Sequence, residues 1–398
     1  MGGKQEVGGK HEVRARLGMT PPLHLLAAIG TRPEVIKLYP VVRALRADPR
    51  FRVTVCATAQ HRHLLDQAMA VFGLEADIDL DLMQAAQGLG ELTGRVLHRF
   101  GETIDRLKPD RIMVQGDTTT AMAAAMAAFY RKVPVDHVEA GLRTGDMHSP
   151  FPEEFNRRMV GLVCDLHFAP TQRSADALLA EGVLPSRVIM TGNTVIDALL
   201  LTRASIRGDE PEIAPLKALL PDPASGKRII LVTAHRRENH DGGMDRIADA
   251  LARIAARPDV VIVFPVHPNP KVREVMDARI GSCTNIHLIA PQDYRAFVHL
   301  MDRADFILSD SGGVQEEAPA LGKPVIVMRD TTERPEAVEA GVAILAGTDP
   351  ARLSALAHRL LDDAAFHASM VKSASPFGDG KAASRIVDAI AAHAGLPG

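Results

Sequence analysis

Short apolar segments alternate with stretches of helical pattern along most of the chain. Helical patterns follow at, for example, 33–47 and 119–130. Strands that alternate with helices of about 10–15 residues are typical of βαβ units, which build parallel sheets. The sequence therefore predicts an α/β protein, and in the first half its predicted strands are 23–30, 51–58, 110–117, 133–140, 165–170 and 186–192.

The alternation starts again after a polar, proline-rich stretch at 208–227, which indicates a second domain. The length of 398 residues also favours two domains, at roughly 100–200 residues each. We expect two doubly wound, Rossmann-like domains at 23–193 and 194–380, with a C-terminal helix at about 381–398 packing back on the first. Ligands of such sheets bind at the carboxyl ends of the strands, so we expect the active site in a cleft between the domains. The strands predicted in the second domain are 227–235, 259–267, 285–291, 305–310 and 323–330.

Several classes of protein are disfavoured by the sequence. Residues 1–22 are polar and charged without the apolar segment of a signal peptide, and we expect them to form a disordered leader. No apolar run approaches the ~18 residues that a membrane span needs. The net charge of -3 does not indicate binding to nucleic acid or to an anionic membrane. The cysteines Cys56, Cys164 and Cys283 are too far apart to suggest a metal site, and they suit a reducing cytoplasm.

The segment GTRPEVIK, residues 30–37, follows the first predicted strand. Pro33 suits the first turn of a helix, and Arg32 and Lys37 then lie near that helix N-terminus, where an anion is stabilised. An ordinary strand-to-helix turn with two surface cations would explain the same residues.

The segment DSGGVQEE, residues 310–317, is a stronger candidate for phosphate binding. Ser311, Gly312 and Gly313 open a helix after a strand, where backbone N–H groups and a hydroxyl can hold a phosphate. Glu317 lies one turn further, where a carboxylate can accept hydrogen bonds from ribose hydroxyls. Its alternative role is to complement the helix dipole.

Arg334, in TTERPEAV, follows the next strand and is a second candidate phosphate cation, or else the partner in a surface salt bridge. The chain contains neither a Walker loop, G-x-x-x-x-G-K-[ST], nor a strand followed by G-x-G-x-x-G. A phosphate site here would therefore differ from both common nucleotide-binding motifs.

Acid and base candidates stand at four further strand ends: Asp117, Glu139, Glu153 and His235. Each alone is explained by helix capping or by surface exposure, and Glu154 beside Glu153 is a second first-turn acid. Together they should face one site, where clustered carboxylates acquire different pKa values and can act as acid and base. The chain has no H-E-x-x-H metal motif and no G-x-S-x-G nucleophile motif.

Taken together, these segments resemble the non-hydrolysing UDP-N-acetylglucosamine 2-epimerase family from about residue 23 to the C-terminus. The resemblance implies a glycosyltransferase-B-like fold and a homodimer. It also implies an isomerase that interconverts UDP-N-acetylglucosamine (UDP-GlcNAc) and UDP-N-acetylmannosamine (UDP-ManNAc) without a metal or nicotinamide cofactor. The segments that carry it are GTRPEVIK, TAQHRHLLDQ, QGDTTTAMAAAMAAFY, HVEAGLRTGDMHSPFPEEFNR, TGNTVIDAL, HRRENH, PVHPNP, DSGGVQEEAPALGKPV and MRDTTERPEAVEAG.

The mechanism that the resemblance implies is elimination of UDP to a 2-acetamidoglucal and re-addition with inverted C2. Exchange of a proton on both faces of C2 requires at least two acid/base groups. By resemblance these come from Asp117, Glu139 and Glu153, carried in part on a mobile loop, and His235 assists near the phosphate. The sequence does not assign a carboxylate to a face.

The same resemblance places further residues around the substrate. Gln292 and Phe297 are implied around the uracil and Glu317 on the ribose, and Phe297 is alternatively a plain core aromatic. The diphosphate is implied to lie near Arg32, Lys37, Arg334, Ser311, Gly312 and Gly313. Members of the family can bind a second UDP-GlcNAc as an activator, and the matching positions are Gln60, His61, Arg236 and His267.

One departure from the family concerns Asp136, which stands where members often have glycine. Strand alternation puts positions 136 and 139 on opposite faces, so we expect little effect on Glu139. Other functions stay open at this point: an epimerase for a modified 2-acetamido sugar, a hydrolysing epimerase, a glycosyltransferase, or a non-catalytic nucleotide-sugar sensor. We expect the product to serve the synthesis of a cell-surface polysaccharide.

Overall fold

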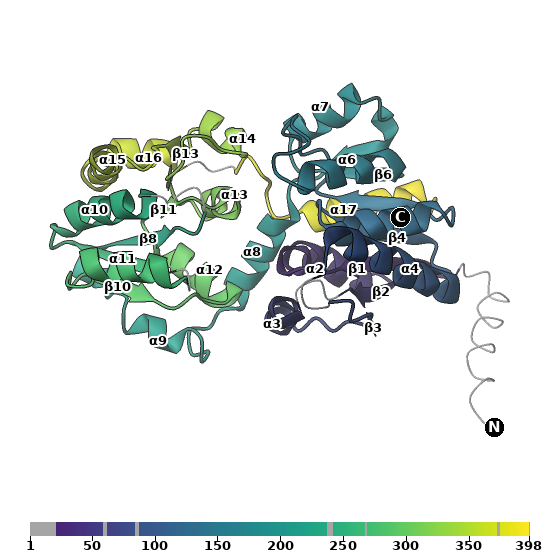
Figure 1. Cartoon of the computed structure of the whole chain (residues 1–398), viewed down its shortest axis with the longest axis horizontal. Helices are drawn as coiled ribbons and strands as arrows, with labels where there is room; N and C mark the ends of the chain where they lie inside the picture. Colours follow the sequence, from purple (N-terminus) through teal and green to yellow (C-terminus); the bar gives the residue numbers. More distant parts are fainter. Residues whose placement is uncertain are drawn as a thin grey trace. The chain divides into compact units, whose positions relative to one another are not determined.

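The computed structural model describes residues 21–58, 62–83, 87–236, 242–266, 269–371 and 375–397. The chain divides into two compact units (Figure 1). Unit 1 comprises Met1–Thr194 and Lys381–Gly398, and unit 2 comprises Val195–Gly380.

Unit 1 contains a parallel sheet with the strand order β3-β2-β1-β4-β5-β6-β7. Its strands are β1 (Leu23–Ile29), β2 (Phe51–Ala57), β3 (Ile78–Asp79), β4 (Arg111–Gln115), β5 (Val135–Val138), β6 (Leu166–Ala169) and β7 (Val188–Met190). Its helices are α2 (Arg32–Ala47), α3 (Arg62–Phe72), α4 (Leu89–Leu107), α5 (Thr119–Phe129), α6 (Glu153–Val163), α7 (Gln172–Ala180), the 3-10 helix η1 (Pro185–Arg187) and α17 (Ala382–His393).

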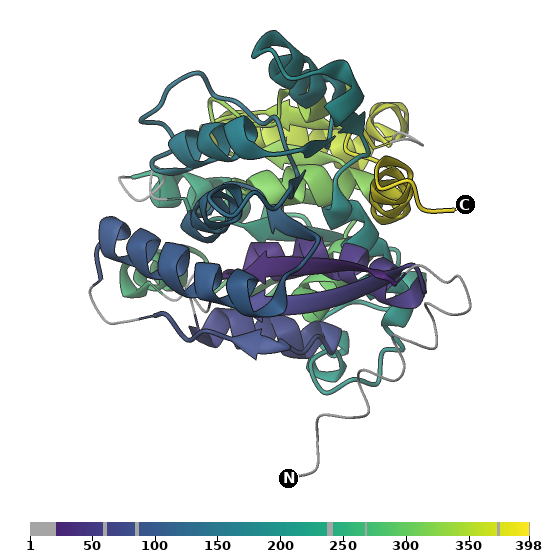
Figure 2. The same ribbon diagram turned by 90° about the vertical axis from the view of Figure 1, so that its right-hand side faces the viewer.

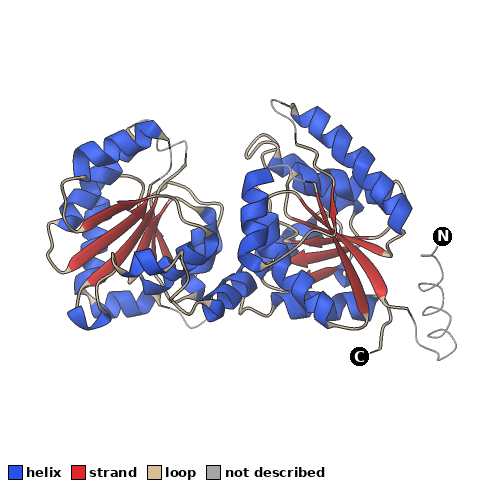
Figure 3. Cartoon of the chain, turned by 90° about the horizontal axis from the view of Figure 1, so that it is seen from below, coloured by secondary structure: helices blue, strands red, loops and turns tan. Residues whose placement is uncertain are grey.

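The sheet of unit 1 is covered on both faces, which explains why its strands are almost continuously apolar. Successive side chains of β1 point to opposite faces, so Leu25 joins one hydrophobic core and Leu26 the other. Helices cover both faces of the sheet (Figures 2 and 3). Helices α2 and α17 contribute to the first core, and α4 and α5 contribute to the second. The last helix of the chain, α17, packs against α2, close to the first strand.

Unit 2 contains a parallel sheet with the order β10-β9-β8-β11-β12-β13. Its strands are β8 (Arg228–Thr233), β9 (Val260–Pro265), β10 (Ile286–Ile289), β11 (Phe306–Ser309), β12 (Val325–Val327) and β13 (Ala343–Leu345). Its helices are α8 (Thr194–Ser205), which starts at the unit boundary, α9 (Ala214–Lys217), η2 (Pro223–Ser225), α10 (Gly243–Ala255), α11 (Pro270–Ile280), α12 (Tyr294–Arg303), α13 (Gly312–Ala320), α14 (Pro335–Glu339), α15 (Pro350–Asp362) and α16 (Ala364–Met370).

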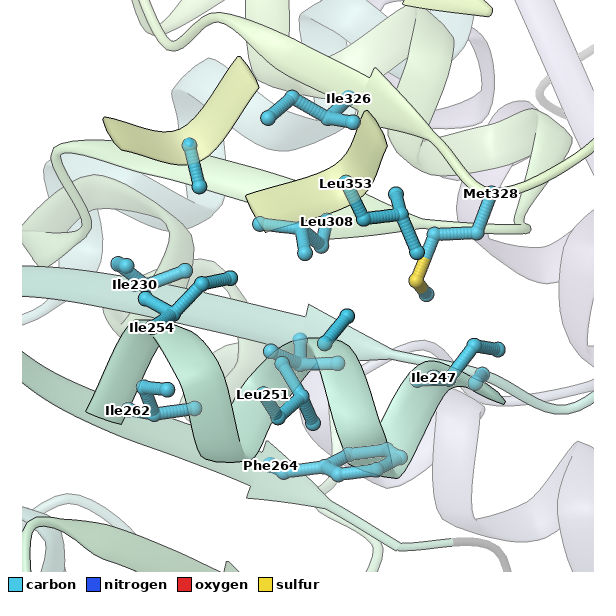
Figure 4. Packing of buried hydrophobic residues seen from close by; sticks show 14 of the residues in the cluster. Ile230, Ile247, Leu251, Ile254, Ile262, Phe264, Leu308, Ile326, Met328 and Leu353 are labelled. Carbon is cyan, nitrogen blue, oxygen red and sulfur yellow. The ribbon is translucent and has the colours of Figure 1, made fainter. Parts of the chain in front are cut away.

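The core of unit 2 forms where α10 lies on the sheet (Figure 4). Ile247, Leu251 and Ile254 recur on one helical face of α10 and are fully buried. They pack into one cluster with apolar side chains of the sheet and of α15, among them Ile230, Ile262, Phe264, Leu308, Ile326 and Leu353.

The prediction of two doubly wound parallel α/β domains is confirmed by these sheets. Every strand predicted from an apolar segment is present, shortened by one to five residues in all. The two short edge strands, β3 and β13, were not predicted. Among the described residues, no helix is long and apolar enough to cross a membrane.

In both sheets the strand order reverses between the first strand and the fourth. The reversal lies between β1 and β4 in unit 1, and between β8 and β11 in unit 2. The carboxyl ends of the strands at such a switch point are where ligands bind in open α/β sheets. Most of the candidate site residues follow these strands.

Candidate active site

Glu139 directly follows β5 and is held by three side chains from other parts of unit 1. Lys37 Nζ on α2 lies 2.5 Å from Glu139 Oε1, and Asn193 Nδ2 donates to the same oxygen at 3.0 Å. The side-chain amide of Gln115, at the end of β4, donates to Oε2. The Glu139 side chain is only 9% exposed. The structure thus brings together two predicted site residues, Glu139 and Lys37.

The backbone of Glu139 adopts the left-handed conformation, with φ 63°. This conformation costs a non-glycine residue roughly 1–2 kcal/mol. Residues held in such conformations cluster at functional sites, where the surrounding contacts over-determine their position. The ion pair and the two amide hydrogen bonds provide such contacts here.

Asp117 follows β4 and is bound by two residues of α6. Arg157 donates to Asp117 Oδ2 through Nε, at 3.0 Å, and through Nη2, and Asn156 Nδ2 donates to the Asp117 carbonyl oxygen at 2.8 Å. Helix α5 is capped by Thr118, whose side chain accepts from Ala121 N. Helix capping, the alternative role for Asp117, is therefore filled by Thr118.

Glu153 is the first residue of α6, and its Oε2 atom is buried with no hydrogen-bond partner among the described residues. It lies three and four positions before Asn156 and Arg157, so the three side chains share one helical face. Because the other two bind Asp117, the first turn of α6 lies beside the end of β4.

Glu154 differs from its neighbour because it is fully buried and fully bonded. It accepts from the backbone N–H groups of Thr144, at 3.0 Å, and Gly145, at 3.4 Å, and from Arg158 Nε at 2.9 Å. Burial opposes ionisation, but these hydrogen bonds and Arg157 prevail and lower the Glu154 pKa. Glu154 therefore fixes the connection between β5 and α6.

Arg32 is the first residue of α2 and is half-buried, at the switch point between β1 and β4. Its position at a helix N-terminus suits an anion site.

In unit 2, Asp310 joins the two loops of the switch point. It is fully buried and its Oδ2 accepts from the backbone N–H groups of His235 and Arg236, both at 2.9 Å. His235 Nδ1 lies 3.1 Å from Asp310 Oδ1. Burial raises the Asp310 pKa, but the hydrogen bonds from His235 and Arg236 outweigh it and the pKa is lowered. The His235 side chain itself is about half exposed.

The N-terminus of α13 is formed by the predicted phosphate loop. Ser311 is the N-cap residue, its side chain makes no capping hydrogen bond, and Gly312 and Gly313 begin the helix. A Cβ atom at Gly312 would lie 3.8 Å from Arg236 Nη2 and 3.9 Å from Arg334 Cζ. Two guanidinium groups therefore lie at the end of the helix where an anion is already stabilised.

The predicted nucleoside residues lie on the neighbouring helix and turn. Tyr294 OH, on α12, donates to Glu317 Oε1 on α13 at 2.6 Å, which fixes the carboxylate. Gln292 Nε2 donates to the Ala290 carbonyl oxygen at 2.7 Å, and Phe297 is half-buried on α12. Arg334 forms an ion pair with Glu316.

Three positions predicted for a second ligand, Gln60, His61 and His267, lie outside the described residues. The fourth, Arg236, lies at the N-terminus of α13. In the part of the chain that the structure describes, no cluster of three or more His, Cys, Asp or Glu residues could hold a metal ion.

Sequence reasoning missed several partners that position the candidate residues: Gln115, Asn193, Arg157, Asp310 and Tyr294. Gln115 and Asp310 stand at strand ends, and a search for polar residues at every such position would have found them. Arg157 lies inside α6 and Tyr294 is the first residue of α12, and nothing local marks either as a partner of a site residue.

Comparison with known proteins supports a single family. The family model for UDP-N-acetylglucosamine 2-epimerase matches residues 43–391. The UDP-N-acetylglucosamine 2-epimerase of Escherichia coli K12 is 50% identical over 369 residues, covering 92% of this chain and 98% of that protein.

Solved structures agree with this. A putative UDP-N-acetylglucosamine 2-epimerase from Listeria monocytogenes has a TM-score of 0.86 and 44% identity, covering 94% of this chain and 97% of that one. The UDP-GlcNAc 2-epimerase from Neisseria meningitidis, bound to UDP-GlcNAc, has a TM-score of 0.82 and 42% identity, covering 92% and 99%. This chain therefore belongs to the UDP-N-acetylglucosamine 2-epimerase family.

Proposed function

We propose that the protein catalyses the reversible C2 epimerisation of UDP-GlcNAc to UDP-ManNAc, without releasing free sugar. Membership of the family supports the reaction, and the Neisseria meningitidis relative binds UDP-GlcNAc. The product would supply N-acetylmannosamine for a cell-surface polysaccharide. We also propose that the enzyme acts as a cytoplasmic homodimer.

The observation that carries the proposal is that candidate carboxylates gather in unit 1 and candidate phosphate-binding groups gather in unit 2. In unit 1, Glu139, Asp117 and Glu153 stand at or beside the ends of neighbouring strands. In unit 2, the N-terminus of α13 lies beside Arg236 and Arg334. Carboxylates suit a sugar that develops positive charge, and N–H groups with cations suit a departing diphosphate.

The proposed reaction begins with cleavage of the bond between C1 and the diphosphate oxygen, whose electrons leave with UDP. A base takes the proton from C2, and the electrons of that C–H bond form the double bond of 2-acetamidoglucal. In the return step the diphosphate oxygen adds to C1, and an acid delivers a proton to the opposite face of C2. Removal and delivery on opposite faces require two groups, for which Glu139, Asp117 and Glu153 are the candidates.

The contacts of Glu139 suit it to act beside a reacting carbon. The Lys37 ammonium group and the amides of Gln115 and Asn193 fix both carboxylate oxygens in place. A carboxylate held in this way needs little reorganisation when the substrate arrives. Asp117 is fixed similarly by Arg157, whereas the buried Oε2 of Glu153 has no partner among the described residues and is available to a substrate hydroxyl or C–H group.

The nucleotide would be bound by unit 2. We assign the diphosphate to Ser311, Gly312, Gly313 and Arg334, with Arg32 and Lys37 of unit 1 as further cations and His235 assisting. The ribose is assigned to Glu317, which Tyr294 orients, and the uracil to Gln292 and Phe297. Gln60, His61, Arg236 and His267 stay the proposed contacts of a second, activating UDP-GlcNAc.

The test is to incubate the purified protein with UDP-GlcNAc and follow the products by proton NMR. Growth of UDP-ManNAc to a constant ratio, with neither free sugar nor UDP accumulating, is the expected result. Accumulation of free N-acetylmannosamine and UDP would identify a hydrolysing epimerase, and binding without any change would indicate a sensor. UDP-GlcNAc that carries ¹⁸O at the oxygen bridging C1 and the β-phosphorus tests the elimination. Cleavage of the C1–O bond frees the β-phosphate to rotate, so the isotope can move to a non-bridging position.

A further inference from the structure

Glu34 is a fully buried carboxylate that the proposed chemistry does not use. It lies in the first turn of α2, two residues after Arg32. Its Oε2 accepts from the backbone N–H of Gly30 at 3.0 Å and from Thr31 Oγ1 at 2.7 Å. Its Oε1 accepts from Thr118 Oγ1 at 2.7 Å.

These contacts connect the two loops at the switch point of unit 1. Gly30 and Thr31 follow β1, and Thr118 follows β4, one residue after Asp117. A carboxylate on α2 therefore ties the loop that carries Arg32 to the loop that carries Asp117. The arrangement parallels unit 2, where Asp310 ties the loop after β8 to the loop after β11.

The packing around Gly30 leaves no room for a side chain at this position. A Cβ atom at Gly30 would collide with Thr120 Oγ1 and lie 2.5 Å from Thr58 Oγ1. Thr58 and Thr120 are themselves hydrogen-bonded at 2.8 Å. The ends of β1 and β2 and the start of α5 therefore meet at Gly30, which donates to the Glu34 carboxylate.

The groups that donate hydrogen bonds to the Glu34 carboxylate, from Gly30, Thr31 and Thr118, are all neutral. Burial raises its pKa to about 7, and hydrogen bonds from Thr118, Thr31 and Gly30 partly oppose the rise. Lys37, three residues further along α2, pairs with Glu139, and Asp117, the residue before Thr118, pairs with Arg157. Both the neutral and the ionised carboxyl group can bridge the two loops, because a protonated Oε1 can donate to Thr118.

We propose that Glu34 is a positioning residue, which holds the loop of Arg32 and the loop of Asp117 at the spacing that the epimerisation needs. The proposal rests on the proposed function, because it assigns Arg32 to the phosphate and Asp117 to acid/base chemistry. Glu34 itself does not touch the substrate. Removing it should disturb the alignment of the reacting groups more than the binding of the nucleotide.

The test compares Glu34→Ala, Glu34→Asp and Glu34→Gln with the wild-type enzyme. The alanine variant removes the bridge and the aspartate variant is one methylene too short for both loops, so kcat should fall at least about tenfold, with KM for UDP-GlcNAc changing less. The glutamine variant can accept from Gly30 and Thr31 and donate to Thr118, so it should keep most of kcat. If Glu34→Ala does not fold, the aspartate variant carries the comparison.

The matched control is Asp136→Asn. Asp136 is equally buried in the same sheet, but it pairs with Arg111 near the amino ends of β4 and β5. This change should lower stability and leave kcat of the folded enzyme unchanged. The proposal would be overturned by a wild-type kcat in Glu34→Asp. It would also be overturned if kcat fell equally in Glu34→Gln and Glu34→Ala, or if kcat fell as much in Asp136→Asn as in Glu34→Ala.

Hydrogen–deuterium exchange provides a readout that does not depend on turnover. Without the bridge, the backbone amides of 29–32 and 115–119 should exchange faster together in Glu34→Ala or Glu34→Asp, and not in Asp136→Asn. If the wild-type protein did not epimerise UDP-GlcNAc, the proposed function would fail, and exchange alone would decide whether Glu34 holds the loops. Unchanged exchange in both segments would refute that bridge.

Discussion

At the scale of single residues, surroundings rather than residue type separate the roles of the carboxylates. Glu153 and Glu154 are adjacent and read alike in sequence, yet Glu154 is fully bonded and Glu153 has a buried oxygen without a partner among the described residues. Glu139 has an ion pair and two amide donors. The partners of Glu139 come from distant parts of the sequence, so the candidates were predictable and their individual contacts were not.

The substitution Glu139→Gln tests the role of the best-held carboxylate. The amide keeps the shape of the side chain but cannot take or give the proton, so kcat should fall by about 10²–10⁴-fold. Steady-state rates with UDP-GlcNAc measure this, with Glu75→Gln, an exposed site in the same unit, as the control. A Glu139→Gln enzyme with more than half of wild-type kcat would remove Glu139 from the chemistry.

We expect the substitution Glu34→Gln to raise the free energy of unfolding relative to wild type by an amount that depends on pH. Burial raises the pKa of the Glu34 carboxyl from its ordinary value of 4.5 to about 7, so between these values the folded protein keeps a proton that the unfolded chain has released. The stability that this group contributes is therefore complete below pH 4.5 and is lost as the pH rises to about 7. The loss is about 3 kcal/mol, at 1.36 kcal/mol per pKa unit.

Glutamine does not titrate, so the variant should gain stability relative to wild type by about that amount between pH 4.5 and pH 8. Urea unfolding of both proteins at several pH values measures the difference. A difference that does not change with pH would show that Glu34 has an ordinary pKa in the fold.

At the scale of elements, the strands were predictable because buried parallel strands are almost continuously apolar. Strands β3 and β13, which are two and three residues long, were not predicted. Between β5 and α6, residues 144–149 are exposed. Glu154, Asn156 and Arg157 at the start of α6 are buried, because they bond to that loop and to Asp117.

The loop between β8 and α10 should depend on Asp310. The change Asp310→Asn replaces one of the two carboxylate oxygens with a donor and weakens the hold on the N–H groups of His235 and Arg236, at a cost of roughly 1–3 kcal/mol for a buried group left unsatisfied. Because these residues lie beside the N-terminus of α13, UDP affinity should fall about tenfold or more, as measured by calorimetry.

The matched control is Asp305→Asn at the other end of β11. Asp305 also accepts a backbone N–H of the neighbouring strand, from Ile229 at 2.7 Å, and pairs with Arg228. The control should lose stability and keep its UDP affinity. Equal affinities for UDP in the two variants would contradict a role for Asp310 at the nucleotide site.

At the scale of the whole molecule, the sequence predicted the two-domain architecture and the family, because both depend on patterns that extend over the entire chain. It did not predict a surface for assembly. Large apolar side chains are exposed on and beside the paired helices α5 and α6: Phe129 at 55%, Tyr130 at 64%, Phe155 at 42% and Leu162 at 79%. Phe155 and Leu162 are seven positions apart, so they lie on one face of α6, and exposed apolar faces mark interaction surfaces.

We expect the proposed homodimer to use this α5–α6 surface. Leu162→Glu places a charge on it and should shift the protein from dimer to monomer in light scattering coupled to size-exclusion chromatography. Leu184→Glu, 58% exposed outside the surface, is the control and should stay dimeric. A dimer that tolerates Leu162→Glu at micromolar concentration would place the interface elsewhere.

The measurement that tests the central claim most directly is epimerisation of UDP-GlcNAc in D₂O, followed by proton NMR. If separate groups of unit 1 remove and deliver the C2 proton, deuterium should enter C2 of UDP-ManNAc as it forms, and later C2 of the remaining UDP-GlcNAc. Formation of UDP-ManNAc that retains its C2 proton would contradict a mechanism with two exchanging acid/base groups. Absence of any UDP-ManNAc would contradict the epimerase itself.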